Sequence, residues 1–239
     1  MSAALDAGIT LFDTADVYGD SEPVLGECPR GQRDRVILAT DSATAQWTGD
    51  TGPRQGRRGD VPISAVPSSR PCVASARTTS ISTRSIRPIR RPPIEETLAA
   101  LTELVREGEV RYIGNSNFAA WQITEAACVA RFSGYEPFVS AQNHWSLLHR
   151  DLEDEVVPAA RHSGLGVLPY FPLANGLLTG EVRRGAAFPE GTRIAQSAYQ
   201  VTEARLDTVE SLIAWGAKRS LTLLDIAVGG LAASRAALR

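Results

Sequence analysis

An aspartate and a tyrosine near the N-terminus have the types and spacing of a proton-transfer site. Asp13 and Tyr18 stand five residues apart, directly after the apolar stretch of residues 8–12. A phenol can give a proton to a substrate oxygen, but its ordinary pKa of about 10 requires a charged neighbour for action near neutral pH. A strand that ends in such residues presents their side chains at one rim of a sheet or barrel, where α/β enzymes carry their reactive groups. Asp13 and Tyr18 are therefore candidate active-site residues.

Strand-like and helix-like segments alternate over most of the chain, which indicates parallel βα units. The helix expected at 93–107 has the clearest signals, because Pro93 stands in its first turn, an apolar stripe follows, and Gly108 ends it. The expected strands are 8–13, 36–40, 110–114, 138–142 and 166–170, and the other expected helices are 21–30, 119–132, 152–162, 202–218 and 222–233. Periodicity alone predicts an α/β chain with parallel strands.

Residues 51–92 break this alternation. They contain nine Arg, much Ser, Thr and Pro, and a single acid, Asp60. No apolar period runs through them, which is typical of a flexible Arg/Ser-rich insertion. They also lack the interleaved aromatic residues of a nucleic-acid site. We predict one domain over residues 1–239, with an irregular segment at 51–92.

The composition limits the class of protein. Of 239 residues, 43% are hydrophobic and 22% charged, with a net charge of -2, which suits one domain with a large core. This charge balance does not favour nucleic acid or an anionic membrane as a partner, and no apolar run approaches the roughly 18 residues of a membrane span. The cysteines fit neither a metal site nor a disulfide framework. We therefore expect no metal and a cytoplasmic location.

Five blocks of the chain resemble, in order, the aldo-keto reductase family. The blocks are residues 13–26, 36–40, 93–118, 142–150 and 168–180. The resemblance implies a (β/α)8 TIM barrel and NADP(H)-dependent hydride transfer to a small aldehyde or ketone. It also implies that Asp13 and Tyr18 are catalytic, with Tyr18 as the proton donor to the carbonyl oxygen.

The same resemblance implies a cofactor site on the later strands. Its residues are Ser116, Asn117, Gln142, Tyr170, Phe171, Leu173 and Gly176. The first three match residues that hydrogen-bond the nicotinamide carboxamide, Tyr170 matches the aromatic residue under the nicotinamide ring, and the last three match the loop around the pyrophosphate. Apart from the resemblance, Ser116 and Asn117 are also typical of a cap between a strand and a helix.

Two catalytic positions of the family pattern hold other residue types. The family's lysine follows Ala39-Thr40, where this chain has Asp41, and Lys218 is the only lysine among the 25 basic residues. The family's histidine ends a strand before residue 93, but the three histidines of this chain come later, and we interpret them as structural. A carboxylate near a phenol raises the phenol pKa instead of lowering it. We therefore expect impaired catalysis.

The barrel implied by the resemblance is expected to be incomplete. Its first and eighth strands have no counterpart at the two ends of the chain, and its fourth, expected between residues 41 and 93, is missing or scrambled. We expect a chain truncated at both ends, and hypothesise that residues 41–92 are read in a shifted frame. Sequencing the gene tests this idea, which fails if no frame encodes a Gln-x-His strand. Two alternatives to a weak enzyme stay open: a non-catalytic nucleotide-binding regulatory subunit, and an inactive gene product without a stable fold.

Overall fold

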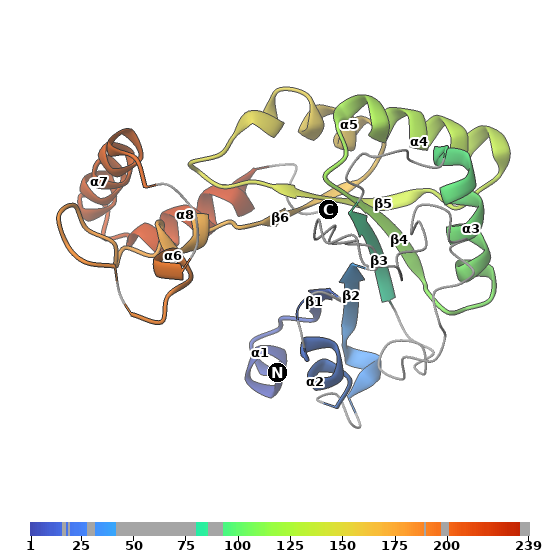
Figure 1. Cartoon of the computed structure of the whole chain (residues 1–239), viewed down its shortest axis with the longest axis horizontal. Coiled ribbons are helices and arrows are strands. Elements are labelled where there is room, and N and C mark those ends of the chain that lie inside the picture. Colours follow the sequence, from blue (N-terminus) through green and yellow to red (C-terminus); the bar gives the residue numbers. More distant parts are fainter. Residues whose placement is uncertain are drawn as a thin grey trace, which may run out of the picture.

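Six parallel strands form one sheet in the order β1-β2-β3-β4-β5-β6 (Figure 1). The computed structural model describes residues 1–15, 18, 20–27, 32–41, 80–85, 93–188, 190–196 and 201–234. The strands are β1 Leu11–Ala15, β2 Ile37–Asp41, β3 Ser80–Ser85, β4 Tyr112–Ser116, β5 Phe138–His144 and β6 Gly166–Tyr170. Each strand pairs with its neighbour in sequence, and within the described residues β1 and β6 are the edges. The prediction of an α/β chain with parallel strands is confirmed.

Helices cover the outer side of β4–β6 (Figure 1). They are α3 Ile94–Arg106, α4 Ala120–Ser133 and α5 Val156–His162. The apolar stripe expected on α3 is buried at Leu98 and Leu101, which join one core cluster with Ile113 of β4 and Val167 of β6. α4 ends at Gly134, whose φ of 69° is a left-handed conformation that glycine adopts without steric cost. This packed layer fixes the positions of the three strands beneath it.

The N-terminal strands have a much smaller core. α1 Ser2–Asp6 and α2 Ser21–Glu27 lie beside β1 and β2 (Figure 1). The buried members of this cluster are only Leu5, Val36 and Leu38, among the residues that the structure describes. β1 has one neighbour in the described sheet, which is β2. Little apolar surface therefore holds β1 in place.

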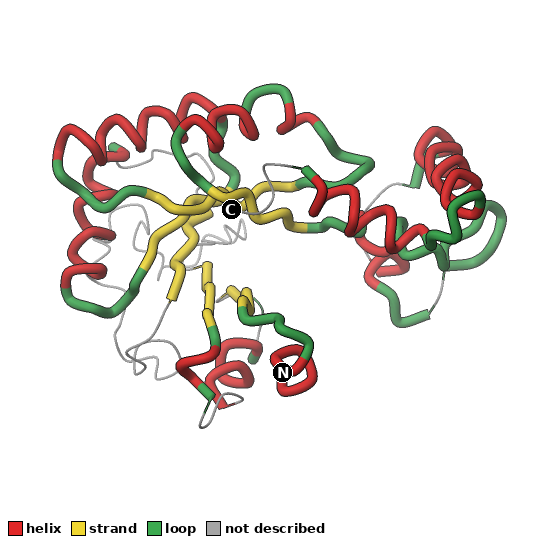
Figure 2. Tube along the Cα trace, turned by 180° about the vertical axis from the view of Figure 1, so that it is seen from behind, coloured by secondary structure: helices red, strands yellow, loops and turns green. Residues whose placement is uncertain are grey.

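Three helices after β6 form a separate group at one end of the molecule (Figure 1, Figure 2). They are α6 Arg193–Gln196, α7 Glu203–Ala217 and α8 Leu223–Ala233. α7 and α8 meet closely at Gly216, where an added Cβ would lie 2.7 Å from Ile226 Cδ1. α8 begins with a capping box in which Thr222 and Asp225 hydrogen-bond each other's backbone N–H groups. Their second core packs against the loop that follows β5.

A strand, β3, lies between residues 41 and 93, so the expectation that the strand here is missing is wrong, whereas a scrambled strand stays a prediction. β3 pairs with β2 on one side and with β4 on the other. Its sequence, Ser-Ile-Ser-Thr-Arg-Ser, has little apolar character but includes the β-branched residues Ile81 and Thr83. A strand here pairs with backbone N–H and C=O groups of both neighbouring strands. This pairing allows a strand to form despite the weak strand propensity of the segment. The rest of the segment 51–92, predicted to be irregular, lies outside the described residues.

The other predicted elements are close to the observed ones. β6 coincides with the expected strand 166–170, and the boundaries of the other four expected strands differ by at most three residues. The loop expected up to residue 201 contains the short helix α6 and a 3-10 turn at Ala174–Gly176. In the described part of the chain, no strand precedes β1 or follows β6. The absence of the first and eighth barrel strands stays a prediction.

Candidate active site

The carboxyl ends of distant strands meet at one site. Gln142 Nε2 on β5 donates a hydrogen bond of 3.1 Å to Asp13 Oδ2 on β1. The two strands are four places apart in the sheet, and strands about 4.8 Å apart would separate them by about 19 Å if the sheet were flat. The sheet is therefore strongly curled, and its curl brings a predicted catalytic residue to a predicted cofactor residue.

Asn117 lies at the centre of the hydrogen bonds around this edge. It follows β4 with a φ of 58°, a left-handed conformation that asparagine tolerates better than most residues. Its backbone N–H donates to the carbonyl of Gln142 at 2.9 Å, and its Nδ2 donates to Ser116 Oγ at 3.1 Å. Ser116 is almost fully buried, and its hydroxyl oxygen holds the Asn117 amide through this hydrogen bond. Ser116 is thus the last residue of β4, and the left-handed turn at Asn117 directs the chain away from the strand.

Tyr170 completes this network at the end of β6. Its hydroxyl donates a hydrogen bond of 2.7 Å to Asn117 Oδ1. Its ring stacks on the His144 imidazole, with ring centres 5.3 Å apart and planes at 12°. Asp13, Gln142, Asn117 and Tyr170 are therefore joined by consecutive hydrogen bonds from three different strands and the residue after a fourth. The residues that the resemblance assigns to the nicotinamide lie together.

The loop after Tyr170 is a tight turn. Phe171 has a φ of 52° and its ring meets the Tyr170 ring edge-on at 5.3 Å. Gly176 has a φ of 107°, which only glycine adopts readily, and its N–H donates to the Leu173 carbonyl at 3.0 Å. Arg193 of α6 lies over the Phe171 ring, 5.7 Å from its centre. This loop, predicted to surround the pyrophosphate, thus directly adjoins Tyr170.

The Tyr18 side chain is not part of the hydrogen-bond network that joins Asp13, Gln142, Asn117 and Tyr170 in the described residues. Its side chain is 61% exposed, and within the described part of the chain its phenol makes no hydrogen bond. Its backbone is fixed, because its N–H donates to the Ala15 carbonyl at 3.1 Å. Asp41, predicted at the lysine position, ends β2 in register with Ala15. The strand predicted to end in histidine corresponds in sheet position to β3, which contains none.

His144 is a site residue that sequence reasoning missed. Besides Tyr170, its ring stacks on His149, with centres 4.0 Å apart and planes at 13°. Burial lowers the pKa of His144 below its ordinary value, and the nearby His149 and Arg205 lower it further, whereas Asp151 opposes them. The signal that could have identified it is its spacing, since residues 142 and 144 point to the same side of a strand.

The loop after β5 is anchored by a buried tryptophan. Trp145 is 1% exposed, and its indole Nε1–H donates to Glu153 Oε1 at 2.9 Å. Arg150 forms a two-point ion pair with the same carboxylate, and its hydrogen bond is the largest cause that lowers the pKa of Glu153. This anchoring holds the segment that carries His144 and His149.

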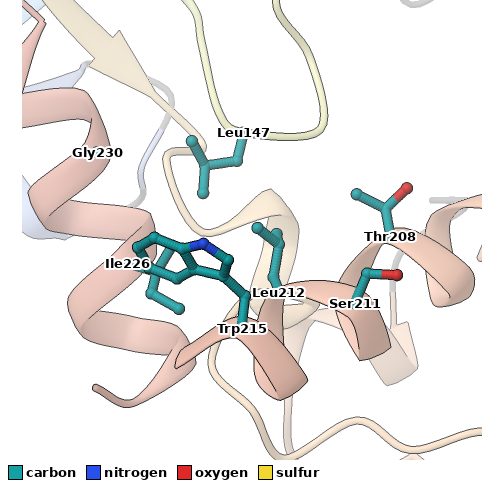
Figure 3. A pocket seen from close by; sticks show the side chains of 7 residues that line it. All are labelled: Leu147, Thr208, Ser211, Leu212, Trp215, Ile226 and Gly230. Atoms are coloured by element: carbon teal, nitrogen blue, oxygen red, sulfur yellow. The ribbon is translucent and has the colours of Figure 1, made fainter. Parts of the chain in front are cut away.

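A separate apolar hollow lies between α7 and α8, away from the strand ends. It has a volume of about 420 Å³ and is lined by Leu147, Thr208, Ser211, Leu212, Trp215, Ile226 and Gly230 (Figure 3). None of the predicted site residues lines it.

Within the described residues, no three His, Cys, Asp or Glu side chains are grouped to hold a metal, and no helix is long and apolar enough to cross a bilayer.

A curled parallel sheet, with an amide, carboxylate and tyrosine network at its carboxyl edge, defines the class of α/β proteins that carry their site at strand ends. Residues 1–229 match the aldo/keto reductase family, and the chain belongs to that family. It is 37% identical over 219 residues to "Uncharacterized oxidoreductase YrpG" of Bacillus subtilis (strain 168). The match covers 86% of this chain and 65% of that relative. The chain thus spans slightly less than two thirds of the length of this relative.

Proposed function

We propose that this chain is an NADP(H)-binding member of the family that reduces an aldehyde or ketone, with impaired turnover. The observation that carries the proposal is the network Asp13–Gln142–Asn117–Tyr170, which joins a predicted catalytic residue to three predicted cofactor residues. We further propose that β1–β6 are consecutive strands of a (β/α)8 barrel. The curl of the sheet supports this, because a barrel requires strands distant in sequence to approach each other.

The chemistry of the donor set fits a nicotinamide. A carboxamide both donates and accepts hydrogen bonds, and Asn117 and Gln142 offer amide groups of the same kind at one edge. Tyr170 is partly exposed and held by hydrogen bond and stacking, so it offers a fixed aromatic surface for a planar ring. Asn117 and Gln142 would bind the carboxamide, and the turn at Phe171–Gly176 would adjoin the phosphates.

When bound, NADPH would supply the hydride that the carbonyl carbon accepts. The chain supplies the proton: the Tyr18 O–H bond breaks, a new O–H bond forms at the carbonyl oxygen, and an alcohol results. The resulting phenolate recovers its proton from water, which the exposed position of Tyr18 permits. Asp13 contributes by fixing Gln142 through their hydrogen bond.

Impairment follows from the residues at two strand ends. A cation at position 41 would favour the phenolate formed when Tyr18 gives up its proton, whereas Asp41 opposes it. β3 offers no histidine to align the carbonyl oxygen. General acid help is typically worth about 10²–10⁴-fold in rate, so we expect turnover reduced by a factor of this size.

The test measures turnover and binding separately. NADPH oxidation with an activated aldehyde reports catalysis, and quenching of NADPH fluorescence reports binding. Tyr18→Phe should lower the residual turnover of the purified chain by less than the roughly 10²–10⁴-fold of full general acid help, because part of that help is already lost, and should leave the dissociation constant for NADPH unchanged. Equal turnover of the two proteins would exclude Tyr18 as the proton donor.

Nucleotide binding without catalysis is the second candidate. The observation that favours it is the contrast between the joined cofactor residues and the exposed Tyr18. Binding of NADPH with no oxidation of any activated aldehyde would support this candidate over the enzyme. A broad melting transition that NADPH does not raise would instead support a chain without a stable fold, because a ligand that binds only the native state must stabilise it.

A further inference from the structure

We propose that His144 is a positioning residue for Tyr170, and that protonation of His144 releases the Tyr170 ring and weakens NADP(H) binding. The inference rests on the proposed function, in which Tyr170 carries the nicotinamide ring. His144 would thereby make cofactor affinity fall in mildly acidic conditions.

Asn117 and His144 contact Tyr170 in different ways. Asn117 fixes the hydroxyl by the 2.7 Å hydrogen bond, which acts at one end of the ring. His144 lies beside Tyr170 in the register of β5 and β6, and its ring covers one face of the phenol ring at 12° between planes. Stacked aromatic pairs typically contribute about 0.5–1.5 kcal/mol beyond the area that they bury. His144 therefore sets the plane of the Tyr170 ring.

The stack continues to a second imidazole with a fixed backbone. His149 covers His144 with ring centres 4.0 Å apart. The His149 backbone is tied to Ser146 by two reciprocal N–H to C=O hydrogen bonds, both 3.1 Å long. His144 is thus held between His149 and Tyr170 and has little freedom to turn while the stack persists.

The surroundings of His144 favour its neutral form. His149 and Arg205 of α7 are the basic groups facing it, and Asp151 of the following 3-10 turn is the acidic group that partly opposes them. Arg193 lies further out, over the Phe171 ring that meets His144 edge-on. His144 Nε2 is buried and has no hydrogen-bond partner among the described residues. Burial and the two basic groups lower the pKa of His144, so the neutral ring is the stacked one.

Protonation changes this balance. An imidazolium has an N–H donor at both nitrogens, and the donor at Nε2 would be buried without a partner in a ring whose charge Arg205 and His149 also disfavour. A move of the ring towards water would relieve both costs. Tyr170 would then lose the partner on that face. Since the pKa of His144 is lowered, the change should occur as the pH falls below about 6.5, the ordinary value for histidine.

The test compares variants of the full chain. NADP⁺ is the probe because NADPH decomposes in acid, and titration calorimetry gives its dissociation constant at about pH 8 and about pH 5.5, on either side of the histidine range. We expect wild-type affinity to fall between these values by less than about tenfold, since about tenfold is the limit for one linked proton at the ordinary histidine pKa and the pKa of His144 is lowered. His144→Phe keeps an aromatic ring but cannot be protonated, so at both pH values its affinity should stay near the value that the wild type has at about pH 8. His144→Ala should bind weakly at both.

His162→Ala is the matched control, because His162 is exposed on α5 outside the stack and the variant should follow the wild type. A His144→Phe protein that loses affinity in acid as much as the wild type would overturn the proposal. So would wild-type affinity of His144→Ala at the higher pH.

A measurement without cofactor separates this proposal from the proposed function. Proton NMR of the cofactor-free chain should show the Tyr170 ring resonances changing as His144 titrates, and this change should be absent in His144→Phe. If NADP⁺ binds to no variant, the proposed function fails, and the NMR titration still decides whether His144 positions Tyr170. Tyr170 resonances that do not change while His144 titrates would show that it does not.

Discussion

Two regions of the molecule carry the two parts of the predicted site, and they are built differently. The β4–β6 half, residues 93–170, carries the four predicted nicotinamide residues beneath three helices and a large buried core. The β1–β2 half, the described residues of 1–41, carries Asp13 and Tyr18 over a cluster of three buried residues. The hydrogen bond between Gln142 and Asp13 connects the halves.

The difference teaches that binding and catalysis need not be supported equally well in one chain. In the β4–β6 half, every predicted nicotinamide contact has a hydrogen bond to another of them. In the β1–β2 half, β1 is an edge strand in the described sheet and Tyr18 is mostly exposed. Regions with few buried apolar contacts open first, so binding should be the more robust of the two properties.

The largest expected effect comes from removing the tryptophan that anchors the β4–β6 half. Trp145→Ala deletes a fully buried ring and leaves Glu153 without its indole hydrogen bond. Large-to-small changes of this kind typically cost about 3–5 kcal/mol, a large fraction of the stability of a domain. Urea unfolding followed by circular dichroism should show the main transition strongly reduced or lost.

Two further variants make this result a comparison. Trp121→Ala removes the same ring from a position that is 65% exposed, so it should change stability by less than about 0.5 kcal/mol. Leu38→Ala weakens the small cluster of the β1–β2 half and should leave the main transition in place. A Leu38→Ala protein as unstable as Trp145→Ala would mean that the halves unfold as one unit.

The parts predicted from sequence and the parts missed have physical explanations. The helix α3 was predictable because its apolar stripe and end signals are local properties of the chain. β3 was not, because its pairing depends on the edges of β2 and β4 and not on its own apolar content. The bond from Gln142 to Asp13 depends on the curl of the sheet, and the His144 stack depends on the register of β5 and β6. Local spacing indicates only that residues 142 and 144 share one side of a strand, and it specifies neither of these two contacts.

A substitution at Asn115 in the β4–β6 half should raise the free energy of unfolding, whereas Trp145→Ala lowers it. Asn115 of β4 is 0% exposed, and neither atom of its amide has a hydrogen-bond partner among the described residues. A buried polar group without a partner typically costs about 1–3 kcal/mol. Asn115→Val should therefore raise the free energy of unfolding by an amount of this size, since valine also suits a strand. Urea unfolding measures it.

Ser140→Ala tests the same argument on the neighbouring strand. Its hydroxyl is also buried without a partner among the described residues, and the change removes only one oxygen. The gain should have the same sign and be smaller. A loss of stability in Asn115→Val would show that the amide is satisfied in solution and that this half contains no such defect.

A smaller effect, on NADP⁺ affinity, distinguishes the two halves by making the same Tyr-to-Phe substitution in each. Tyr170→Phe deletes only the hydroxyl that binds Asn117, a neutral hydrogen bond worth about 0.5–1.5 kcal/mol. Its NADP⁺ affinity should fall by up to about tenfold, the factor that corresponds to this energy. Tyr18→Phe deletes the same atom in the other half and should leave the affinity unchanged. An equal loss of affinity in both variants would contradict the division of labour between the halves.

The smallest expected effect is that of restoring a lysine alone. Asp41 ends β2 in register with Ala15, and Ala15 precedes Tyr18 by only a few residues. Asp41→Lys therefore puts a cation at the position where the family pattern has one. Turnover of an activated aldehyde should nevertheless stay far below that of a complete site, because β3 has no histidine to align the carbonyl oxygen and β1 has little core to hold it. The rates of NADPH oxidation by the wild type and by Asp41→Lys, compared at equal cofactor saturation, measure the difference in turnover. A rise of the full 10²–10⁴-fold that general acid help typically supplies would mean that the lysine position alone limits the chain, and that the weak β1–β2 half does not.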